Sequence, residues 1–326
     1  MGRLFDYSFS TVAGYSLFGS TDLWLCFVKR FTSDVDLFYP KYLYNLYDLH
    51  NPCYTKGGDL MRINVAMQKG GVGKTTTSIN LAGALADRGH DVLAVDADPQ
   101  GGLTLKLGYR DHYREAEFAL YDVLSDIGQL TLNDLDQLIV DGAEFDIVPS
   151  HLRNFRLEKH LYSEARGVEA LKIALDRLKS EYDYIVIDSP PNLGPLADGA
   201  LLAAENVIFP SHPNTIARES LEILFDEIDT LEDKFDDVQI ATVGAVLNEV
   251  SNDGLSSEMQ QWFVDTFGEK YVFEIPDWAV IEHAIEYRTS IFAYNPNDAG
   301  YPWDADKTKA LREKYGEIAE HVEEIE

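Results

Sequence analysis

The residues best suited to chemistry in this chain form one glycine-rich stretch, Lys69–Thr76, with the sequence KGGVGKTT. Glycine adopts left-handed backbone conformations at little cost, so that several N–H groups can converge on one anion. The stretch lies between an apolar segment and a helical pattern, and the amino end of a helix adds partial positive charge. This context predicts a phosphate-binding loop rather than an accidental glycine-rich turn. The residues expected to hold a nucleotide are Gly70, Gly71, Val72, Gly73, Lys74, Thr75 and Thr76.

Side chains of this loop and of a later segment predict a magnesium-dependent nucleotide site. Lys74 is expected to neutralise the β- and γ-phosphates, and Thr75 is expected to place its hydroxyl on Mg²⁺. Asp188 directly follows the apolar segment Tyr184–Ile187. An apolar strand that ends in aspartate is the Walker B arrangement, in which the carboxylate holds Mg²⁺ through water.

A second pair of carboxylates, Asp96 and Asp98, follows the apolar segment Asp91–Val95. Pro99 is expected to stop the strand, and carboxylates at the carboxyl edge of a parallel sheet face the ligand crevice. Asp96 is predicted to order Mg²⁺ or its water shell. The alternative is that these acids only cap the next segment.

The elements that must position these residues alternate between strand and helix patterns. Such alternation predicts right-handed βαβ crossovers and an α/β fold, with a mostly parallel twisted sheet flanked by helices on both faces. The expected strands are Arg62–Met67, Asp91–Val95, Phe145–Val148, Tyr184–Ile187, Asn206–Phe209 and Gln239–Leu247. The expected helices are Lys74–Arg88, Gly167–Lys179, Ile216–Leu231, Leu255–Phe267 and Lys307–Glu326.

The composition excludes several classes of protein. Of the 326 residues, 45% are hydrophobic, which excludes a disordered chain. No apolar run is long enough for a spanning helix, and two cysteines cannot form a disulfide framework. These features predict a cytoplasmic protein without a membrane anchor.

The amino-terminal segment differs in composition from the rest of the chain. Residues 1–60 have a net charge of −1 and 14 of the 38 aromatic residues, which leaves −28 for residues 61–326. Residues 1–60 are interpreted as an aromatic-rich appendage, a poorly ordered extension, or an artefact of a start codon upstream of Met61. Residues 61–326 are predicted to form the nucleotide-binding domain, with 291–326 a loop and a polar terminal helix.

The second lysine of the loop, Lys69, carries a family resemblance. The stretch Gln68–Thr77 (QKGGVGKTTT), followed by Ile-Asn-Leu-Ala, resembles the ParA partition ATPases. They belong to the deviant Walker A group of P-loop NTPases, together with MinD and the nitrogenase iron protein. The resemblance extends over roughly Met61–Phe292, and Asp188–Leu196 resembles the family's switch region, which would sense the γ-phosphate.

The resemblance implies a site shared by two subunits. Lys69 would reach across a nucleotide-sandwich homodimer to the partner's phosphates, and Asp98 would position the attacking water. The implied catalytic residues are therefore Lys69, Lys74 and Asp98. Asn248 would lie near the adenine, with Pro210 beside it; the absence of an N-K-x-D motif also favours adenine over guanine.

The same resemblance implies function and partners. The expected cofactors are ATP and Mg²⁺, with slow hydrolysis to ADP and phosphate that a ParB-like centromere-binding protein stimulates. ATP binding would drive dimerisation and non-specific DNA association, which would place part of the protein on the nucleoid.

Departures from the family weaken the DNA expectation. The stretch Asn248–Gln261 contains no arginine or lysine, and the family's Ile-Pro-Arg is replaced by Ile275-Pro276-Asp277. Non-specific DNA affinity depends on released counterions and falls steeply with salt. The acidic excess itself predicts a salt-loving source, such as a halophilic archaeon, rather than a specific cationic partner.

Three other functions would each require a particular sequence feature. A MinD-like positioning ATPase needs a basic amphipathic terminal helix, whereas Gly316–Glu326 contains no lysine or arginine. A metallocluster carrier needs cysteine ligands, and residues 61–326 contain none. The third alternative, another P-loop enzyme such as an amidoligase or kinase acting on a small molecule, remains possible on the sequence.

Overall fold

The computed structural model describes residues 60–125, 134–235, 238–250 and 254–325. The predicted amino-terminal extension therefore lies outside the described residues, apart from Leu60. Seven strands form one sheet in the order β3-β2-β4-β1-β5-β6-β7, and every neighbouring pair is parallel. The predicted α/β fold is confirmed. The strands are β1 (Met61–Val65), β2 (Val92–Asp96), β3 (Asp146–Val148), β4 (Tyr184–Asp188), β5 (Asn206–Ser211), β6 (Ala241–Val250) and β7 (Val272–Pro276).

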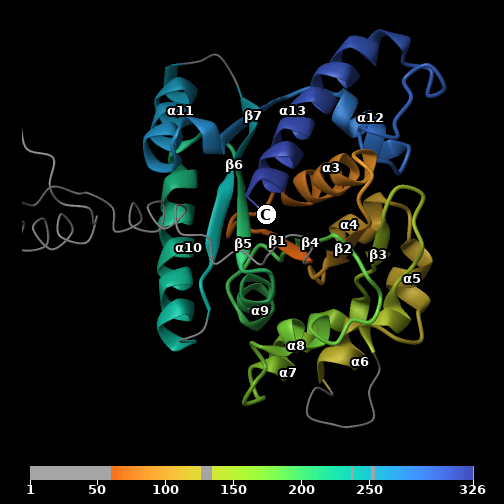
Figure 1. The fold of residues 1–326 in the computed structure, drawn as a ribbon, viewed down its shortest axis with the longest axis vertical. Coiled ribbons are helices and arrows are strands. Elements are labelled where there is room, and N and C mark those ends of the chain that lie inside the picture. The colour runs from red at the N-terminus through yellow and green to blue at the C-terminus, as the bar shows by residue number, and fades with distance from the viewer. Residues whose placement is uncertain (1–59, 126–133, 236–237, 251–253, 326) are drawn as a thin grey trace, which may run out of the picture. The chain divides into compact units, whose positions relative to one another are not determined.

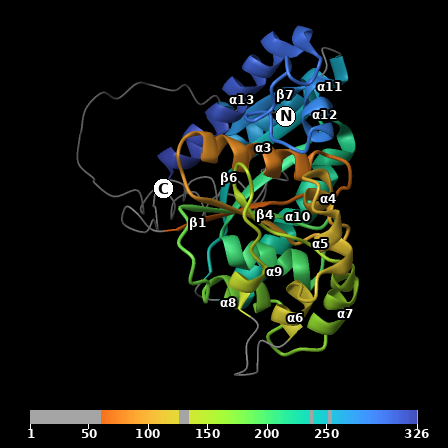
Figure 2. The same cartoon turned by 90° about the vertical axis from the view of Figure 1, so that its right-hand side faces the viewer.

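Helices cover both faces of the sheet (Figures 1 and 2). One face packs against α3 (Lys74–Asp87), α4 (Gly102–Lys106), α12 (Val280–Glu286) and α13 (Ala305–Glu324). The opposite face packs against α6 (Leu120–Ser125), α7 (Leu157–Leu161), α8 (Ala170–Leu175), α9 (Pro195–Ala204), α10 (Thr215–Lys234) and α11 (Gly254–Phe267). The short α5 (Arg110–Glu115) follows α4.

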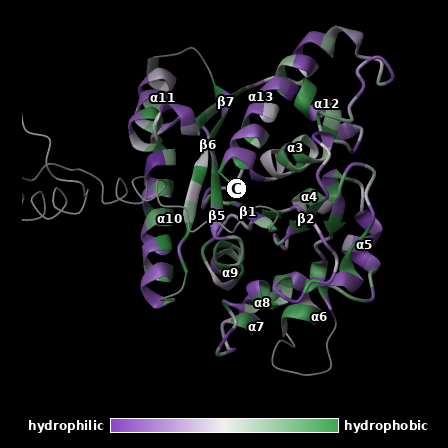
Figure 3. Cartoon of the chain, viewed as in Figure 1, coloured by the Kyte–Doolittle hydropathy of each residue, from purple (hydrophilic) through white to green (hydrophobic). Residues whose placement is uncertain are grey.

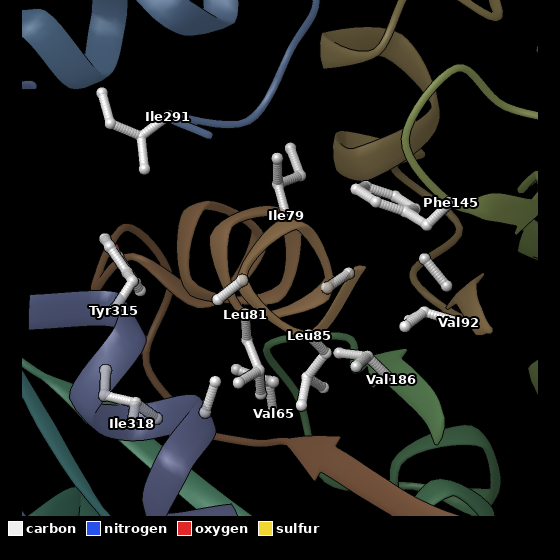
Figure 4. Packing of buried hydrophobic residues seen from close by; sticks show 14 of the residues in the cluster. Val65, Ile79, Leu81, Leu85, Val92, Phe145, Val186, Ile291, Tyr315 and Ile318 are labelled. Carbon is white, nitrogen blue, oxygen red and sulfur yellow. The ribbon is translucent and has the colours of Figure 1, made fainter. Parts of the chain in front are cut away.

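Helix α3 is fixed by apolar packing against the sheet. Leu81 and Leu85 have no exposed surface and lie beside Val65 of β1 and Val186 of β4 (Figure 4). Tyr315 of α13 closes the cluster from the side. Full burial of one such leucine stabilises the fold by about 1.5–3 kcal/mol. This packing holds the first turn of α3, and the loop that precedes it, against the carboxyl end of β1.

The terminal helix α13 is polar on one side and buried on the other. Hydrophilic and hydrophobic residues alternate along α10 and α13, as expected for helices with one exposed face (Figure 3). Arg312 is directed inward, where its guanidinium donates to the carbonyl oxygens of Ile291 and Tyr294 at 2.9 Å each. This cation therefore anchors the preceding loop to α13.

Some element boundaries differ from those predicted. The helix expected over Gly167–Lys179 is confined to Ala170–Leu175, because Gly167 packs against the carbonyl of Leu161 and the chain turns there. Helix α9 was missed because Pro195 and Gly199 argue against a helix; Pro195, however, occupies its first turn, where proline is tolerated. Strand β7 was missed because it is short and only Ile275 in it is fully buried.

No helix among the described residues combines the length and the apolar character needed to cross a membrane.

Candidate nucleotide-binding site

The predicted phosphate loop connects β1 to α3. Gly71 and Gly73 have φ angles of 75° and 93°, which non-glycine residues adopt only under strain. Gly73 caps α3, and its carbonyl accepts a hydrogen bond from the N–H of Thr77 at 2.8 Å. The first turn of α3 carries no acidic residue of its own, so no carboxylate from this turn competes with an anion for its free N–H groups.

Asn248 supports this loop from a distant strand. It lies near the end of β6 and is buried, and its side-chain amide donates to the carbonyl oxygen of Val72 at 2.9 Å. A Cβ atom on Gly73 would come within 2.4 Å of the Asn248 amide nitrogen. The side chain predicted to lie near adenine is therefore in contact with the loop backbone. Pro210 is buried in β5. The contacts of Asn248 and Pro210 with adenine stay predictions.

The two loop lysines are placed differently. The Lys74 side chain is buried, and its ammonium donates to the carbonyl oxygen of Lys69 at 3.1 Å. Burial lowers the pKa of Lys74, and attraction to Asp188 and Asp98 partly offsets that effect. The Lys69 side chain is partly exposed and makes no hydrogen bond or ion pair within the described part of the chain.

The predicted metal residues meet at the carboxyl ends of β2 and β4, where Asp96 and Asp188 are partners in register. The hydroxyl of Thr75 donates to Asp188 Oδ2 at 2.8 Å, and the hydroxyl of Ser78 lies 3.0 Å from Asp188 Oδ1. The Thr75 oxygen keeps lone pairs for a metal while its proton bonds Asp188. These residues therefore fit Mg²⁺.

Asp96 is held from one side only. Its Oδ2 accepts from the backbone N–H of Thr104 at 2.8 Å and from the Thr104 hydroxyl at 2.5 Å. Its Oδ1 is buried and has no hydrogen-bond partner among the residues that the structure describes. Burial raises the pKa of Asp96 well above its ordinary value, and the nearby Asp188 raises it further. A cation or its water shell would satisfy the free oxygen.

Asp98 lies in the turn after β2. Its Oδ1 accepts from the backbone N–H of Gln100 at 2.8 Å, which is the capping contact of the alternative interpretation. The catalytic role of Asp98 stays a prediction. Burial raises its pKa, and the Gln100 hydrogen bond and Lys74 act in the opposite direction. The hydroxyl of Ser150 donates to the Asp98 carbonyl at 2.7 Å and fixes the turn.

Several residues of this network were not predicted. Ser78, Thr104 and Ser150 each hold a carboxylate or a turn of the site in place. The Asn154 amide in turn donates to the Ser150 hydroxyl at 3.2 Å. Ser150 follows β3 and Ser78 lies one turn after Lys74, but hydroxyl residues at such positions are too common to identify a site. Lys106 was also missed; its ammonium lies 3.2 Å from the hydroxyl of Thr76.

Comparisons with known proteins identify the family to which the chain belongs. A family model described as an AAA domain matches residues 61–240. The sporulation initiation inhibitor protein Soj of Bacillus subtilis is 34% identical over 254 residues, which cover 73% of this chain and 92% of Soj. The chromosome partitioning protein ParA of Caulobacter vibrioides is 32% identical over 240 residues, which cover 72% and 88%. The chain belongs to the ParA-type family of P-loop ATPases.

Solved structures extend the comparison to the fold. An ATP complex of McdA from Cyanothece superimposes with a TM-score of 0.68 at 22% identity and covers 82% of this chain and 97% of that one. Cobyrinic acid a,c-diamide synthase of Mycobacterium smegmatis, with bound ADP and magnesium, gives 0.57 at 30% identity and covers 64% and 82%. The predicted cofactors of this ParA-type chain, ATP and Mg²⁺, match the ligands of these structures.

We expect the substitution Gly73→Ala to destabilise the protein by at least about 1–2 kcal/mol, because alanine is strained in the left-handed region. It should also abolish ADP binding, because the new Cβ would displace Asn248. The matched control is Gly316→Ala in α13, where a Cβ meets no atom within 4 Å. That control should stabilise the fold by about 0.5–1 kcal/mol. Thermal unfolding and calorimetric titration with ADP measure both effects, and wild-type behaviour of Gly73→Ala would refute the loop conformation.

The stability of the nucleotide-free protein should depend on pH through Asp188. Burial raises the pKa of Asp188 to about 6, and hydrogen bonds from Thr75 and Ser78 oppose that rise. The native state therefore binds the proton more tightly than the unfolded chain does. As pH rises from about 4 to about 6, the free energy of unfolding falls because this carboxyl loses its proton. The nucleotide-free Asp188→Asn variant should gain stability relative to wild type across that interval. Urea unfolding at several pH values measures the difference, with Asp277→Asn, at an exposed carboxylate, as the control. A difference that stays constant with pH would contradict the assignment.

Proposed function

We propose that this chain is an ATP-dependent dimerising switch of DNA partition or of a related positioning system. In the proposed cycle, Lys74 and the loop amides bind the triphosphate, and Thr75 and Asp188 hold Mg²⁺. When bound, Mg²⁺ would neutralise charge on the β- and γ-phosphate oxygens. Asp98 would orient a water for attack on the γ-phosphorus, which breaks the bond to the bridging oxygen and leaves ADP and phosphate.

The observation that carries the dimer step is the contrast between the two lysines. The ammonium of Lys74 is buried and bonds the Lys69 carbonyl, whereas the Lys69 side chain has no partner within the described part of the chain. A partly exposed cation next to a phosphate site is free to act on a nucleotide of a facing subunit. Cations supplied in this way stabilise the transition state of phosphoryl transfer. Hydrolysis would therefore be slow until the dimer, and a ParB-like partner protein, complete the site.

The DNA step of the family has weaker support in this chain. Arg312 is engaged with backbone carbonyls, and the Lys307 ammonium lies 5.9 Å from the ring centroid of Trp278. Lys309 lies 3.8 Å from the carboxylate of Glu313. These three cations of α13 thus already have partners within the chain. DNA binding would have to come from the summed charges of two subunits, and the predicted nucleoid association depends on it.

A second candidate function is an ATP-dependent enzyme acting on a small molecule. It is favoured by the identity shared with the cobyrinic acid a,c-diamide synthase. ATP consumption that requires a metabolite, and that proceeds without dimerisation, would support this candidate over the switch.

The proposed switch is tested by sizing the protein at high KCl with ATP, with ADP and without nucleotide, each with and without DNA. We expect a dimer with ATP and monomers otherwise. Asp98→Ala should accumulate ATP-bound dimers, because binding persists while water positioning fails. Lys74→Ala should stay monomeric and bind no nucleotide. A wild-type protein that stays monomeric with ATP would overturn the proposal.

A complementation assay tests whether Lys69 acts on the other subunit. Lys69→Ala and Asp98→Ala should each be inactive alone, since one lacks the cation and the other lacks the water-positioning carboxylate. In a mixed dimer, the Lys69→Ala subunit keeps its own Asp98 and receives Lys69 from its partner. When the two variants are mixed before ATP and Mg²⁺ are added, we expect roughly one quarter of the wild-type rate of phosphate release, because half the dimers are mixed and each has one complete site. If the mixture shows no activity above the separate variants, Lys69 does not act in trans.

A further inference from the structure

A third lysine, Lys106, lies against the first turn of α3. It is the last residue of α4, which packs on α3 so closely that a Cβ on Gly102 would come within 2.9 Å of the Thr75 hydroxyl. Across this contact the Lys106 ammonium lies 3.2 Å from the hydroxyl of Thr76. Lys106 is therefore positioned by a helix that touches the phosphate loop directly.

The charge of Lys106 has no adjacent counterion among the residues that the structure describes. Its side chain is partly buried, and no carboxylate of the described residues lies within ion-pair distance of its ammonium. Burial lowers the pKa of Lys106, and the more distant Asp188 and Glu282 offset only part of that effect. Withdrawing an ammonium from water without a paired anion costs free energy. An unpaired ammonium beside a phosphate loop indicates that a bound anion serves as its counterion.

The position of Thr76 identifies which part of the nucleotide is concerned. Successive residues of a helix are rotated by about 100°, so the Thr76 side chain diverges from that of Thr75, which bonds Asp188 on the metal side. The metal and Lys74 serve the β- and γ-phosphates, whereas the loop and first-turn amides cradle the α- and β-phosphates. With the metal side assigned to the β- and γ-phosphates, the α- and β-phosphates, which ATP and ADP share, are the part that Thr76 and Lys106 could reach.

We propose that Lys106 is a third phosphate-binding cation of the site, which contacts, together with Thr76, the part of the phosphate chain common to ATP and ADP. The proposal rests on the nucleotide binding proposed above and adds a residue to it. Lys106 contributes equally to the ATP and ADP states, and so it retains nucleotide without distinguishing the two. Lys69, which would act on the triphosphate of a facing subunit, would by contrast distinguish ATP from ADP.

Calorimetric titration of wild type and Lys106→Met with ADP and with ATP, in the presence of Mg²⁺, tests the proposal. Methionine keeps the length and apolar stem of lysine and removes the charge. We expect both affinities to fall by the same factor of about ten, since a charge-assisted hydrogen bond is lost. The matched control is Lys309→Met, at an exposed lysine of α13, which should bind both nucleotides as wild type does. Without nucleotide, Lys106→Met should unfold at the wild-type temperature or above it, because an unpaired cation has been removed.

The outcomes separate this proposal from the one on which it rests. Wild-type affinities in Lys106→Met overturn the proposal alone, as does a loss confined to ATP, which would place the ammonium on the γ-phosphate. Failure of the wild-type protein to bind either nucleotide overturns the proposed function as well. Amine-reactive labelling of the unaltered protein provides a second measurement that does not depend on the folding of a variant. ADP should protect Lys106 and leave Lys309 as reactive as before, and equal labelling of Lys106 with and without ADP would refute the contact.

Discussion

The proposed nucleotide site depends on one interaction, the hydrogen bonding of main-chain N–H groups to a phosphate chain. Such binding would require the left-handed conformations that Gly71 and Gly73 adopt, and it would require the loop to stay in that shape. Two supports maintain it. Apolar packing of Leu81 and Leu85 fixes α3 on the sheet, and the Asn248 amide holds the Val72 carbonyl from the end of β6. The loop is thus prepared before any nucleotide arrives.

The protein alone does not stabilise the charged forms of several ionisable groups around the loop. Burial raises the pKa values of Asp96, Asp98 and Asp188 and lowers those of Lys74 and Lys106. Each shift disfavours the charged form, as expected when the natural counterions belong to a ligand rather than to the chain. A metal ion would satisfy the carboxylates, and a phosphate chain would satisfy the lysines. The electrostatics of the site therefore favour a nucleotide–metal complex over either component alone.

The sequence predicted the parts of this site that are local in the chain. The loop and the carboxylates at the ends of β2 and β4 each follow an apolar strand, and parallel strands bring their carboxyl ends to one edge. It did not predict the contact between Asn248 and Val72, because those residues are 176 positions apart and a single asparagine at a strand end carries little signal. Lys106 was missed for a similar reason, since its role arises only when α4 packs on α3. Helix α9 was missed because proline and glycine count against helices by composition, although Pro195 occupies a position that tolerates it.

The central claim is that Lys69 completes the site of a facing subunit. A crystal structure of Asp98→Ala with ATP and Mg²⁺ tests it most directly, because that variant should retain its nucleotide. The account predicts a two-fold dimer in which each Lys69 ammonium lies about 3 Å from a phosphate oxygen bound to the other subunit. A Lys69 side chain that extends into solvent, or that contacts only the nucleotide of its own subunit, would contradict it.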